Sequence, residues 1–310
     1  MMCWKNNKSV GASLMNRGEA LGKPRVGRVG YINCFPIFYP LEKGLIKLSA
    51  QIVADHPSNL NSLFAAGDIE VTAVSSIAYA HQCSSCVVLP DLAIASDGAV
   101  WSVALLSRVP LSQLKGERVS LTPYSATSIA LLQILLSRFY EVEVEYFYRP
   151  QGVSPWWGEP KATLVIGDEA LKTIYRYLEE DELCANQKCY VYDLGAEWKK
   201  FTGKQMVFAL WVVRRDFMEQ HPVLLRETWL ALQEAKSWSS RHRRFIAEQA
   251  QSLIRIPAEI MEDYFRHIKY ELYLNGLHQF FEYAWHCGVL DSQVQAEVWR
   301  DPVVEPVKHG

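Results

Sequence analysis

The sequence lacks the features that mark membrane-spanning, secreted and strongly nucleic-acid-binding proteins. No stretch approaches the roughly 18–20 uninterrupted apolar residues that span a bilayer. Residues 1–24 contain no apolar core of the kind that a secretion signal carries, typically about 7–15 residues long. The 32 basic and 34 acidic residues give a net charge of −2, which leaves no strong field to attract nucleic acid or an anionic membrane. We therefore expect no nucleic-acid partner and no membrane partner.

Signature motifs for nucleotide cofactors, serine hydrolysis and metal binding are missing or weak. The sequence has neither a Walker A motif nor G-x-G-x-x-G, and it has no G-x-S-x-G elbow. Cys83 and Cys86 form an isolated C-x-x-C pair near His81, whereas a zinc site needs about four well-placed ligands. Without a secretion signal, the seven scattered cysteines are expected to be reduced thiols. We expect a cytoplasmic protein with no cofactor and no metal.

The sequence does have the composition of a globular protein. Its 310 residues are 49% hydrophobic and 12% aromatic, which suffices for one large domain or two smaller ones. Residues 1–24 mix Gly, Asn and Lys and are expected to form a disordered leader. From Arg25 onward, short apolar runs alternate with amphipathic segments. This alternation is typical of an α/β protein with parallel strand pairs.

The periodicity of apolar residues predicts where strands and helices lie. A helix over 58–66, capped by Ser58 and ended by Gly67, follows from the helical spacing of its leucines. Further helices are expected at 129–139 and 169–178, and everything after His221 has helical spacing. Strands are expected at 26–32, 51–54, 71–74, 118–122, 142–147, 163–166, 190–192 and 206–213.

Two α/β units followed by helices predict a two-lobed fold with a cleft between the lobes. We expect the chain to cross between lobes near Val109 and again near Gln205. Ligands of open α/β sheets bind beyond the carboxyl ends of the strands, so the interlobe cleft is the expected binding site. The expected divisions are 25–109 plus 206–290 for the first lobe, 110–205 for the second, and 291–310 for a C-terminal tail.

Hydroxyl and amide side chains follow three predicted strands. They lie in the segments 31–33, 74–76 and 124–128, each placed before a helix. A strand-to-helix turn of this kind presents N–H and O–H donors at the positive end of a helix dipole, which suits a carboxylate ligand. Ordinary helix capping by Ser and Thr explains the same pattern. Both interpretations remain open.

Three further motifs have more than one interpretation. Asp168 and Glu169 stand at a helix start, where Asp168 is either an N-cap favoured by the helix dipole or a general base. The basic run 241–244 is typical of a solvated helix face. The loop 154–158 contains Trp156 and Trp157, and nothing in the sequence distinguishes a lid from a partner contact or a self-packed loop.

Several motifs in a fixed order resemble the chorismate dehydratase family of the futalosine route to menaquinone. The resemblance extends over about residues 25–290, and single motifs in it are weak whereas the ordered set is specific. Ile32 and Glu70 depart from it, since Leu and Asp are expected there. The matching segments are VGYINCFP at 29–36, VSSIAY at 74–79, LPDLAIASDG at 89–98, VWSV at 100–103, SATS at 125–128, IGDEAL at 166–171, DLGAEW at 193–198 and FALW at 208–211.

The resemblance implies a fold, a reaction and a substrate. The fold is α/β and two-lobed, of the periplasmic-binding-protein-like (type II) kind. The implied activity is that of a hydro-lyase, which removes water from the small molecule chorismate to give 3-[(1-carboxyvinyl)oxy]benzoate. Aromatisation of the ring drives this elimination, so it needs neither a redox cofactor nor a metal. The enzyme has to hold a dianion, remove one proton and assist one leaving hydroxide.

The resemblance also implies roles for individual residues. Asn33 and Ser76 are expected to line the reacting edge of the substrate. The general base is expected to be Asp168, a bound water or a carboxylate of the substrate itself. The residues expected to bind substrate are Tyr31, Ser75, Ser102, Ser125, Thr127 and Ser128.

Competing functions share the same expected fold. One is a solute-binding protein for a small organic anion, against which the missing secretion signal counts. Another is the related dihydroxynaphthoate-forming synthase of the same pathway, although the motifs at 31–33 and 125–128 favour the dehydratase. A LysR-like effector domain would need a DNA-binding helix-turn-helix, which the leader is too short to supply.

Overall fold

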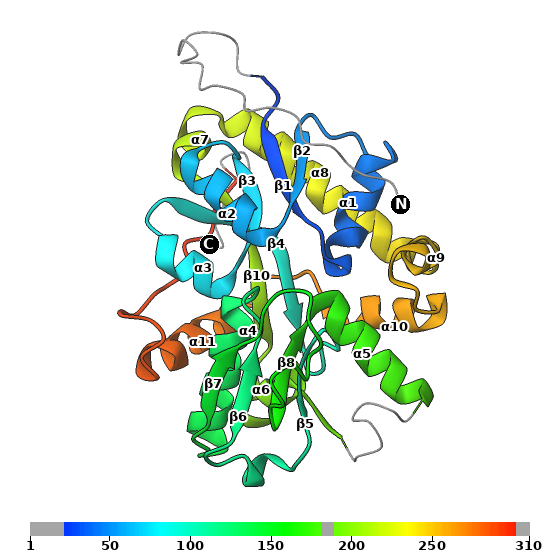
Figure 1. The fold of residues 1–310 in the computed structure, drawn as a ribbon. Helices are drawn as coiled ribbons and strands as arrows, with labels where there is room; N and C mark the ends of the chain where they lie inside the picture. The colour runs from blue at the N-terminus through cyan, green and yellow to red at the C-terminus, as the bar shows by residue number, and fades with distance from the viewer. Residues whose placement is uncertain (1–21, 181–188, 302–310) are drawn as a thin grey trace, which may run out of the picture.

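The chain folds into two lobes, each built on its own β-sheet (Figure 1). The computed structural model describes residues 22–180 and 189–301. The first lobe contains a six-stranded sheet with the order β11-β4-β10-β3-β1-β2, and the second contains a five-stranded sheet with the order β7-β6-β8-β5-β9. Of the expected leader, residues 1–21 lie outside the described part of the chain, as do residues 302–310 of the expected tail.

The first sheet combines parallel and antiparallel pairs. Strand β1 pairs in parallel with β2 and β3, and β10 lies antiparallel between β3 and β4. The strands of this sheet are β1 (Arg25–Val29), β2 (Gln51–Asp55), β3 (Val71–Ser75), β4 (Cys86–Ser96), β10 (Met206–Arg214) and β11 (Ile268–Lys269). The helices of this lobe are η1 (Ile32–Cys34), α1 (Phe35–Glu42), α2 (Pro57–Ala66), α3 (Ser76–Gln82), α7 (Arg215–Gln220), α8 (Pro222–Arg241), α9 (Arg243–Ile254), α10 (Ala258–His267) and α11 (Leu274–His286).

The second sheet has β6 parallel to β7 and β8, and β5 antiparallel to β8 and β9. A π-helical turn, η3, continues helix α4. The strands are β5 (Val103–Ser107), β6 (Arg118–Leu121), β7 (Glu145–Tyr148), β8 (Ala162–Ile166) and β9 (Tyr190–Asp193). The helices are η2 (Leu111–Gln113), α4 (Ala126–Ile134), η3 (Leu135–Phe139), α5 (Gly167–Glu180) and α6 (Leu194–Thr202).

The chain passes from the first sheet to the second between Ser96 and Val103 and returns between Asp193 and Met206. The first passage lies earlier than the expected position near Val109, because β5 ends at Ser107 and already pairs with β8 and β9. Strand β5 is buried along its whole length, and its apolar run carries no sign of which sheet it joins. The expected boundary therefore assigned this strand to the wrong lobe.

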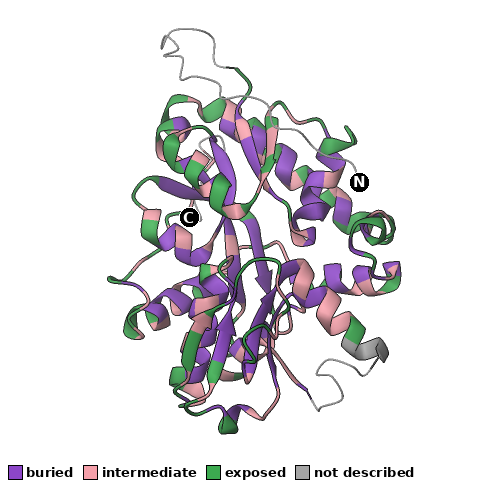
Figure 2. Cartoon of the chain, in the orientation of Figure 1, coloured by how far each residue is buried: buried purple, intermediate pink, exposed green. Residues whose placement is uncertain are grey.

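The centre of each lobe is apolar, and the central strands are buried while the outer helices alternate between buried and exposed faces (Figure 2). Trp211 of β10 and Trp198 of α6 are fully buried. A strand covered on both faces reads as a continuous apolar run, as 206–213 does. Each such large side chain contributes about 1.5–3 kcal/mol by leaving water.

The helix over 58–66 shows one correct and one wrong expectation about its ends. Gly67 ends α2 in the left-handed conformation, with φ at 86°, as predicted. Ser58 is not its cap. The helix begins at Pro57 and His56 is the N-cap residue, because the fixed φ of proline is suited to the first helical position.

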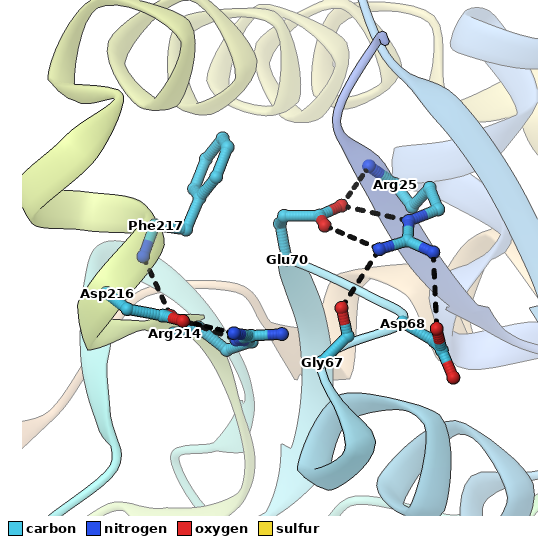
Figure 3. Close-up of polar contacts among 7 residues, drawn as sticks. All are labelled: Arg25, Gly67, Asp68, Glu70, Arg214, Asp216 and Phe217. Atoms are coloured by element: carbon cyan, nitrogen blue, oxygen red, sulfur yellow. Dashed lines mark hydrogen bonds and ion pairs between the residues drawn. The ribbon is translucent and has the colours of Figure 1, made fainter. Parts of the chain in front are cut away.

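An ion pair fastens the start of β1 to the start of β3 (Figure 3). The Arg25 Nη2 donates to Glu70 Oε1 at 2.8 Å, and the Arg25 backbone N–H donates to Glu70 Oε2 at 2.6 Å. The Glu70 carbonyl also accepts from the Arg214 N–H of β10. Glu70 is buried, so its carboxylate depends on these partners. Residues 30–33 and 76 follow β1 and β3. The contacts of Arg25 and Glu70 therefore lie at the opposite ends of these two strands.

The C-terminal segment packs on the first lobe as far as it is described. Val298 pairs with Val88 of β4, and Trp299 is buried. Cys34, Cys83, Cys86 and Cys287 are free thiols, whereas Cys3 and Cys184 lie outside the described residues. Over residues 22–180 and 189–301, every helix is too short or too polar to traverse a bilayer.

Candidate active site

The cleft between the lobes contains two adjoining cavities. The inner cavity, of about 250 Å³, is lined by residues after β1, β3 and β6, including Asn33, Ser75 and Ser125. The outer cavity, of about 360 Å³, is lined by charged residues that include Arg149 and Asp168. Both share the walls formed by Tyr31, Pro57, Pro123, Tyr124 and Ile166. The two names are used in this sense below.

The three hydroxyl-rich strand ends meet at the inner cavity. Ser75 caps α3, since its Oγ accepts from the Ala78 N–H at 3.3 Å. Ser125 caps α4 in the same way, with its Oγ 3.2 Å from the Ser128 nitrogen. Both serines also line the cavity. The capping and ligand-facing interpretations are therefore compatible, because a cap side chain stands at the exposed positive end of its helix.

Asn33 lies in the turn η1, at the carboxyl end of β1, and lines the inner cavity. Its carbonyl accepts from the Tyr270 hydroxyl at 2.8 Å, which fixes the backbone from behind. Its buried side-chain Oδ1 has no hydrogen-bond partner within the described residues. A buried amide oxygen without a partner is costly to leave unsatisfied, so it marks a position where a ligand hydrogen bond is favourable.

The loop before β5 brings Ser102 to the inner cavity. The Asp193 carboxylate accepts from the Val100 and Trp101 N–H groups, at 3.0 and 2.6 Å, and from the Ala196 N–H of α6. Trp101 adopts a positive φ of 62°, which is uncommon for a residue with a side chain. Burial raises the pKa of Asp193, and its backbone N–H donors oppose that rise. The carboxylate thereby holds the strained loop in place.

Asp168 connects the two lobes. It is the second residue of α5, and its Oδ1 accepts from the Ile32 N–H of the first lobe at 3.0 Å. The expected N-cap role is therefore wrong, since the carboxylate points away from its own helix to the next lobe. Burial raises the pKa of Asp168, and the Ile32 hydrogen bond opposes this rise. Asp168 lines the outer cavity and is absent from the lining of the inner one.

Gly167 permits close packing across the cleft. A Cβ at this position would stand 3.1 Å from the Tyr31 ring, and the residue has a φ of +57°. Its N–H donates to the Ser102 carbonyl at 2.6 Å. Tyr31 thus lies against the start of α5, in the wall that the two cavities share.

Two expected site residues do not face the cleft. Ser76 is fully buried, and its hydroxyl donates to the Val207 carbonyl of β10 at 2.7 Å. Thr127 is also fully buried, and its Oγ1 accepts from the Ile77 N–H at the start of α3, 3.0 Å away. Successive residues of a helix point in different directions, so Ser75 and Ser76 cannot both face the cavity. Ser76 and Thr127 therefore have structural roles, since each hydroxyl links two segments of the chain by a hydrogen bond.

Sequence reasoning missed several residues that line the cleft. Arg149 at the end of β7 is 5% exposed, and its Nη1 lies 3.0 Å from Glu169 Oε1 in the outer cavity. His56 lines the same cavity, and Asn61 and Phe208 line the inner one. Asn61 Oδ1 resembles that of Asn33 in having no partner among the residues that the structure describes. An Arg-Pro pair directly after a strand was the available signal for Arg149.

Solved structures with the same architecture include proteins of the periplasmic-binding-protein fold. A protein from Archaeoglobus fulgidus superposes with a TM-score of 0.67 at 20% identity, covering 86% of this chain and 98% of its own. The alkanesulfonate-binding protein of Xanthomonas axonopodis pv. citri, solved with bound MOPS, gives a TM-score of 0.66 at 13% identity, with coverage of 91% and 100%. The expected periplasmic-binding-protein-like fold is confirmed.

Comparison of the sequence identifies the family. A Thermus thermophilus chorismate dehydratase is 30% identical over 263 residues, which cover 83% of this chain and 90% of that protein. The 1,4-dihydroxy-6-naphtoate synthase of the same organism is 29% identical over 229 residues, covering 73% and 76%. The family model described as menaquinone biosynthesis matches residues 24–286, which include both lobes and every residue placed in the cleft above. The chain belongs to the menaquinone biosynthesis family.

Proposed function

We propose that the protein is a hydro-lyase that removes water from chorismate to give 3-[(1-carboxyvinyl)oxy]benzoate. The observation that carries this proposal is the 30% identity to the Thermus chorismate dehydratase over 90% of that protein. The synthase has a shorter match, which covers 76% of its length. The cleft is compatible with the proposal, because the inner cavity has a volume suited to a small organic substrate.

The proposed reaction requires a site that binds the two carboxylates of chorismate. Hydroxyls and helix N-termini bind carboxylates through hydrogen bonds and the helix dipole. Ser75 at α3 and Ser125 at α4 place two such ends at the inner cavity. We assign these two ends to the carboxylates of the substrate. Ser102 and Ser128 supply further hydroxyls at the same cavity.

We assign Asn33 to the reacting edge of the ring. Its unpartnered Oδ1 can accept a hydrogen bond from the C4 hydroxyl and so orient the C4–O bond for elimination. No carboxylate or imidazole is among the described residues that line the inner cavity. The acceptor of the C3 proton is therefore proposed to be a carboxylate of the substrate. As the C3–H electrons form the ring double bond, the C4–O bond breaks with its electron pair on oxygen. The departing hydroxide takes up the proton that the carboxylate has accepted from C3, so one water leaves and the carboxylate is regenerated.

Asp168 then has a positioning role. Its hydrogen bond to the Ile32 N–H fixes the turn that carries Asn33, to which Tyr270 also donates. This hydrogen bond joins α5 of the second lobe to the first lobe, so the position of Asn33 depends on how the two lobes pack. Asp168 as the general base is the competing assignment, and a substitution that separates the two is given in the Discussion.

The direct test is incubation of the purified protein with chorismate and no added cofactor, followed by chromatography and mass spectrometry. We expect a product lighter by one water with the ultraviolet spectrum of a substituted benzoate. Asn275→Ala, an exposed change on α11, serves as the control variant for handling and stability. Absence of any product, from protein that melts cooperatively, would overturn the proposal.

A binding protein is the second candidate, because the fold is shared with an alkanesulfonate-binding protein. The same incubation separates the two functions. A binding protein would show a chorismate-dependent rise in melting temperature with the substrate recovered unchanged. An enzyme would consume the chorismate.

A further inference from the structure

A second, strongly basic cavity lies in the first lobe, outside the interlobe cleft. Its volume is about 400 Å³, and helices α8, α9 and α10 with strand β11 form its walls. Five of its lining residues are cationic and one, Glu271, is acidic. The cationic residues are Lys236, Arg241, Arg243, Arg266 and Lys269. The whole chain has a net charge of −2, so this concentration of positive charge is local.

One of these five cations, Arg266, forms an ion pair. Arg266 pairs with Glu262 and Asp263, and the charge of its guanidinium is compensated there. The other four form no ion pair with a carboxylate in the described ranges 22–180 and 189–301, and they are Lys236, Arg241, Arg243 and Lys269. The charges of Glu271 and Asp91 act on Lys236 at longer range. The neighbouring Arg244, by contrast, pairs with Glu248 and Glu259 outside the cavity. Adjacent arginines of one helix are therefore in opposite electrostatic situations.

The lining is more than a solvated helix face, which is what the sequence of 241–244 predicts. Burial lowers the pKa of Lys236, so the surrounding protein already withdraws this ammonium from water. Its Nζ donates to the Asp91 carbonyl at 2.7 Å, which fixes the head group at the cavity wall. Ser237 and Ser240 add hydroxyls to the same lining. Lys236, which is partly desolvated and fixed, is suited to an anion with several charges, together with the guanidinium groups of Arg241 and Arg243 in the same lining, which form no ion pair among the described residues.

The wall of this cavity also contacts the turn that carries Asn33. The Tyr270 hydroxyl donates to the Asn33 carbonyl at 2.8 Å, and the Ser239 hydroxyl donates to the Pro36 carbonyl. Tyr270 and Ser239 both line the basic cavity. Backbone atoms at 33 and 36 are therefore held by side chains that an occupant of the cavity would touch.

We propose that this basic cavity binds a small anion with two or more negative charges, such as a phosphorylated metabolite, and that its occupancy fixes Asn33 through Tyr270. Guanidinium groups and hydroxyls donate well to phosphate oxygens, and guanidinium groups also pair with carboxylates, so the test compares the two anions. The cavity volume of about 400 Å³ favours a small molecule over a nucleic acid, which would need a basic surface of greater extent.

The binding part of the proposal is tested by isothermal titration calorimetry with pyrophosphate, and with citrate in parallel, at constant ionic strength set by chloride. We expect saturable pyrophosphate binding. Lys236→Gln combined with Arg243→Gln should weaken it by at least about tenfold. Arg244→Gln is the matched control, since it removes the same charge one residue away, and it should leave the affinity within about twofold. Citrate binding tighter than pyrophosphate would overturn the assignment to phosphate.

The proposal fails if pyrophosphate does not saturate the protein, or if Arg244→Gln weakens binding as much as the double variant does. Binding confined to an acidic polypeptide such as polyglutamate would also overturn it, because the occupant would then be a protein surface. If the double variant does not melt cooperatively, Arg241→Gln and Lys269→Gln replace it under the same expectation.

The coupling part rests on the proposed function and has its own readout. Saturating pyrophosphate should change the kcat or KM for chorismate by at least about twofold, and Tyr270→Phe should remove this change while retaining pyrophosphate binding. Unaltered kinetics with pyrophosphate bound would overturn the coupling. Because binding is measured without chorismate, failure of the dehydratase assignment leaves the binding result interpretable.

Discussion

The inner and outer cavities adjoin each other but differ in chemistry. The inner cavity is lined by apolar, hydroxyl and amide side chains, and Asn33 and Asn61 keep amide oxygens there that no described residue satisfies. The outer cavity holds charged groups that are already paired, Arg149 with Glu169 and Asp168 with the Ile32 N–H. The difference indicates that ligand contacts are made inside, whereas in the outer cavity Asp168 joins the two lobes and the Arg149–Glu169 pair orders the second lobe.

The physical reason lies in the cost of burying charge. Arg149 is buried and its charge needs the partly exposed Glu169 as a partner, so this guanidinium is not free to follow a reacting substrate. Neutral hydroxyls and amides cost less to bury and can exchange water for substrate as the cleft fills. An elimination driven by aromatisation needs orientation more than it needs a strong acid or base.

Asn33→Ala tests the inner cavity and has the largest expected effect. Loss of the orienting amide should reduce kcat by about 10²-fold or more, because hydrogen bonds that orient a reacting group act in the transition state. Thermal stability should change little, since the side-chain Oδ1 has no partner within the described residues. Steady-state kinetics and a melting curve measure both quantities. Equal turnover in Asn33→Ala and Asn275→Ala would remove Asn33 from the reaction.

Asp168→Asn tests the outer region. Asparagine keeps an oxygen that can accept from the Ile32 N–H, so a positioning role predicts that kcat falls by less than about tenfold. Asp168→Ala removes the acceptor and should reduce kcat further. A general base would give the opposite pattern, in which both variants lose about 10²–10⁴-fold. The kcat ratio of the two variants therefore distinguishes positioning from proton abstraction.

Ser75 and Ser76 provide a comparison between adjacent residues. Ser76→Ala leaves the Val207 carbonyl without its buried donor and should lower the free energy of unfolding by about 1–3 kcal/mol. Its kcat should match that of the unaltered protein once both are folded. Ser75→Ala removes a cap, worth about 1 kcal/mol, together with a hydroxyl at the inner cavity, so it should also raise KM. Urea unfolding and kinetics check both variants.

The pH dependence of stability gives the smallest expected effect. Because burial raises the pKa of Asp168 above its ordinary value of 3.8, ionising this carboxyl is harder in the folded than in the unfolded protein. At pH values between 3.8 and the raised pKa, the folded state binds more protons than the unfolded state. The free energy of unfolding that this group contributes therefore falls as pH rises through that range. The melting temperature of Asp168→Asn, relative to the unaltered protein, should therefore increase from about pH 4 to pH 7. A difference in melting temperature that stays constant from about pH 4 to pH 7 would contradict this prediction.

Much of the secondary structure could be predicted because its signals are local. The apolar run at 206–213 and the Gly67 stop are decided by residues within one or two turns, and both occur where expected. Strand β5 shows the limit of such signals. Its five buried residues form an apolar run that either sheet could accommodate, and only pairing with β8 and β9 assigns it to the second lobe.

The candidate site was predicted in outline for the same reason. Strand ends rich in hydroxyls follow from the sequence, and the carboxyl ends of strands in one sheet meet at one edge, so Ser75 and Asn33 were expected near each other. Arg149 was missed because an arginine after a strand is usually solvated, and only the fold shows that it is 5% exposed beside Glu169.

The sequence by itself determined the two-lobed α/β architecture and the family to which the chain belongs, since periodicity and ordered motifs are properties of the chain. The tertiary structure decided the direction of individual side chains. Ser76 and Thr127 are buried and hydrogen-bonded to other segments of the chain. Asp168 contacts the other lobe, and Asn33 lines the inner cavity. Those directions depend on contacts between residues far apart in the chain, and such contacts have no signature in local sequence.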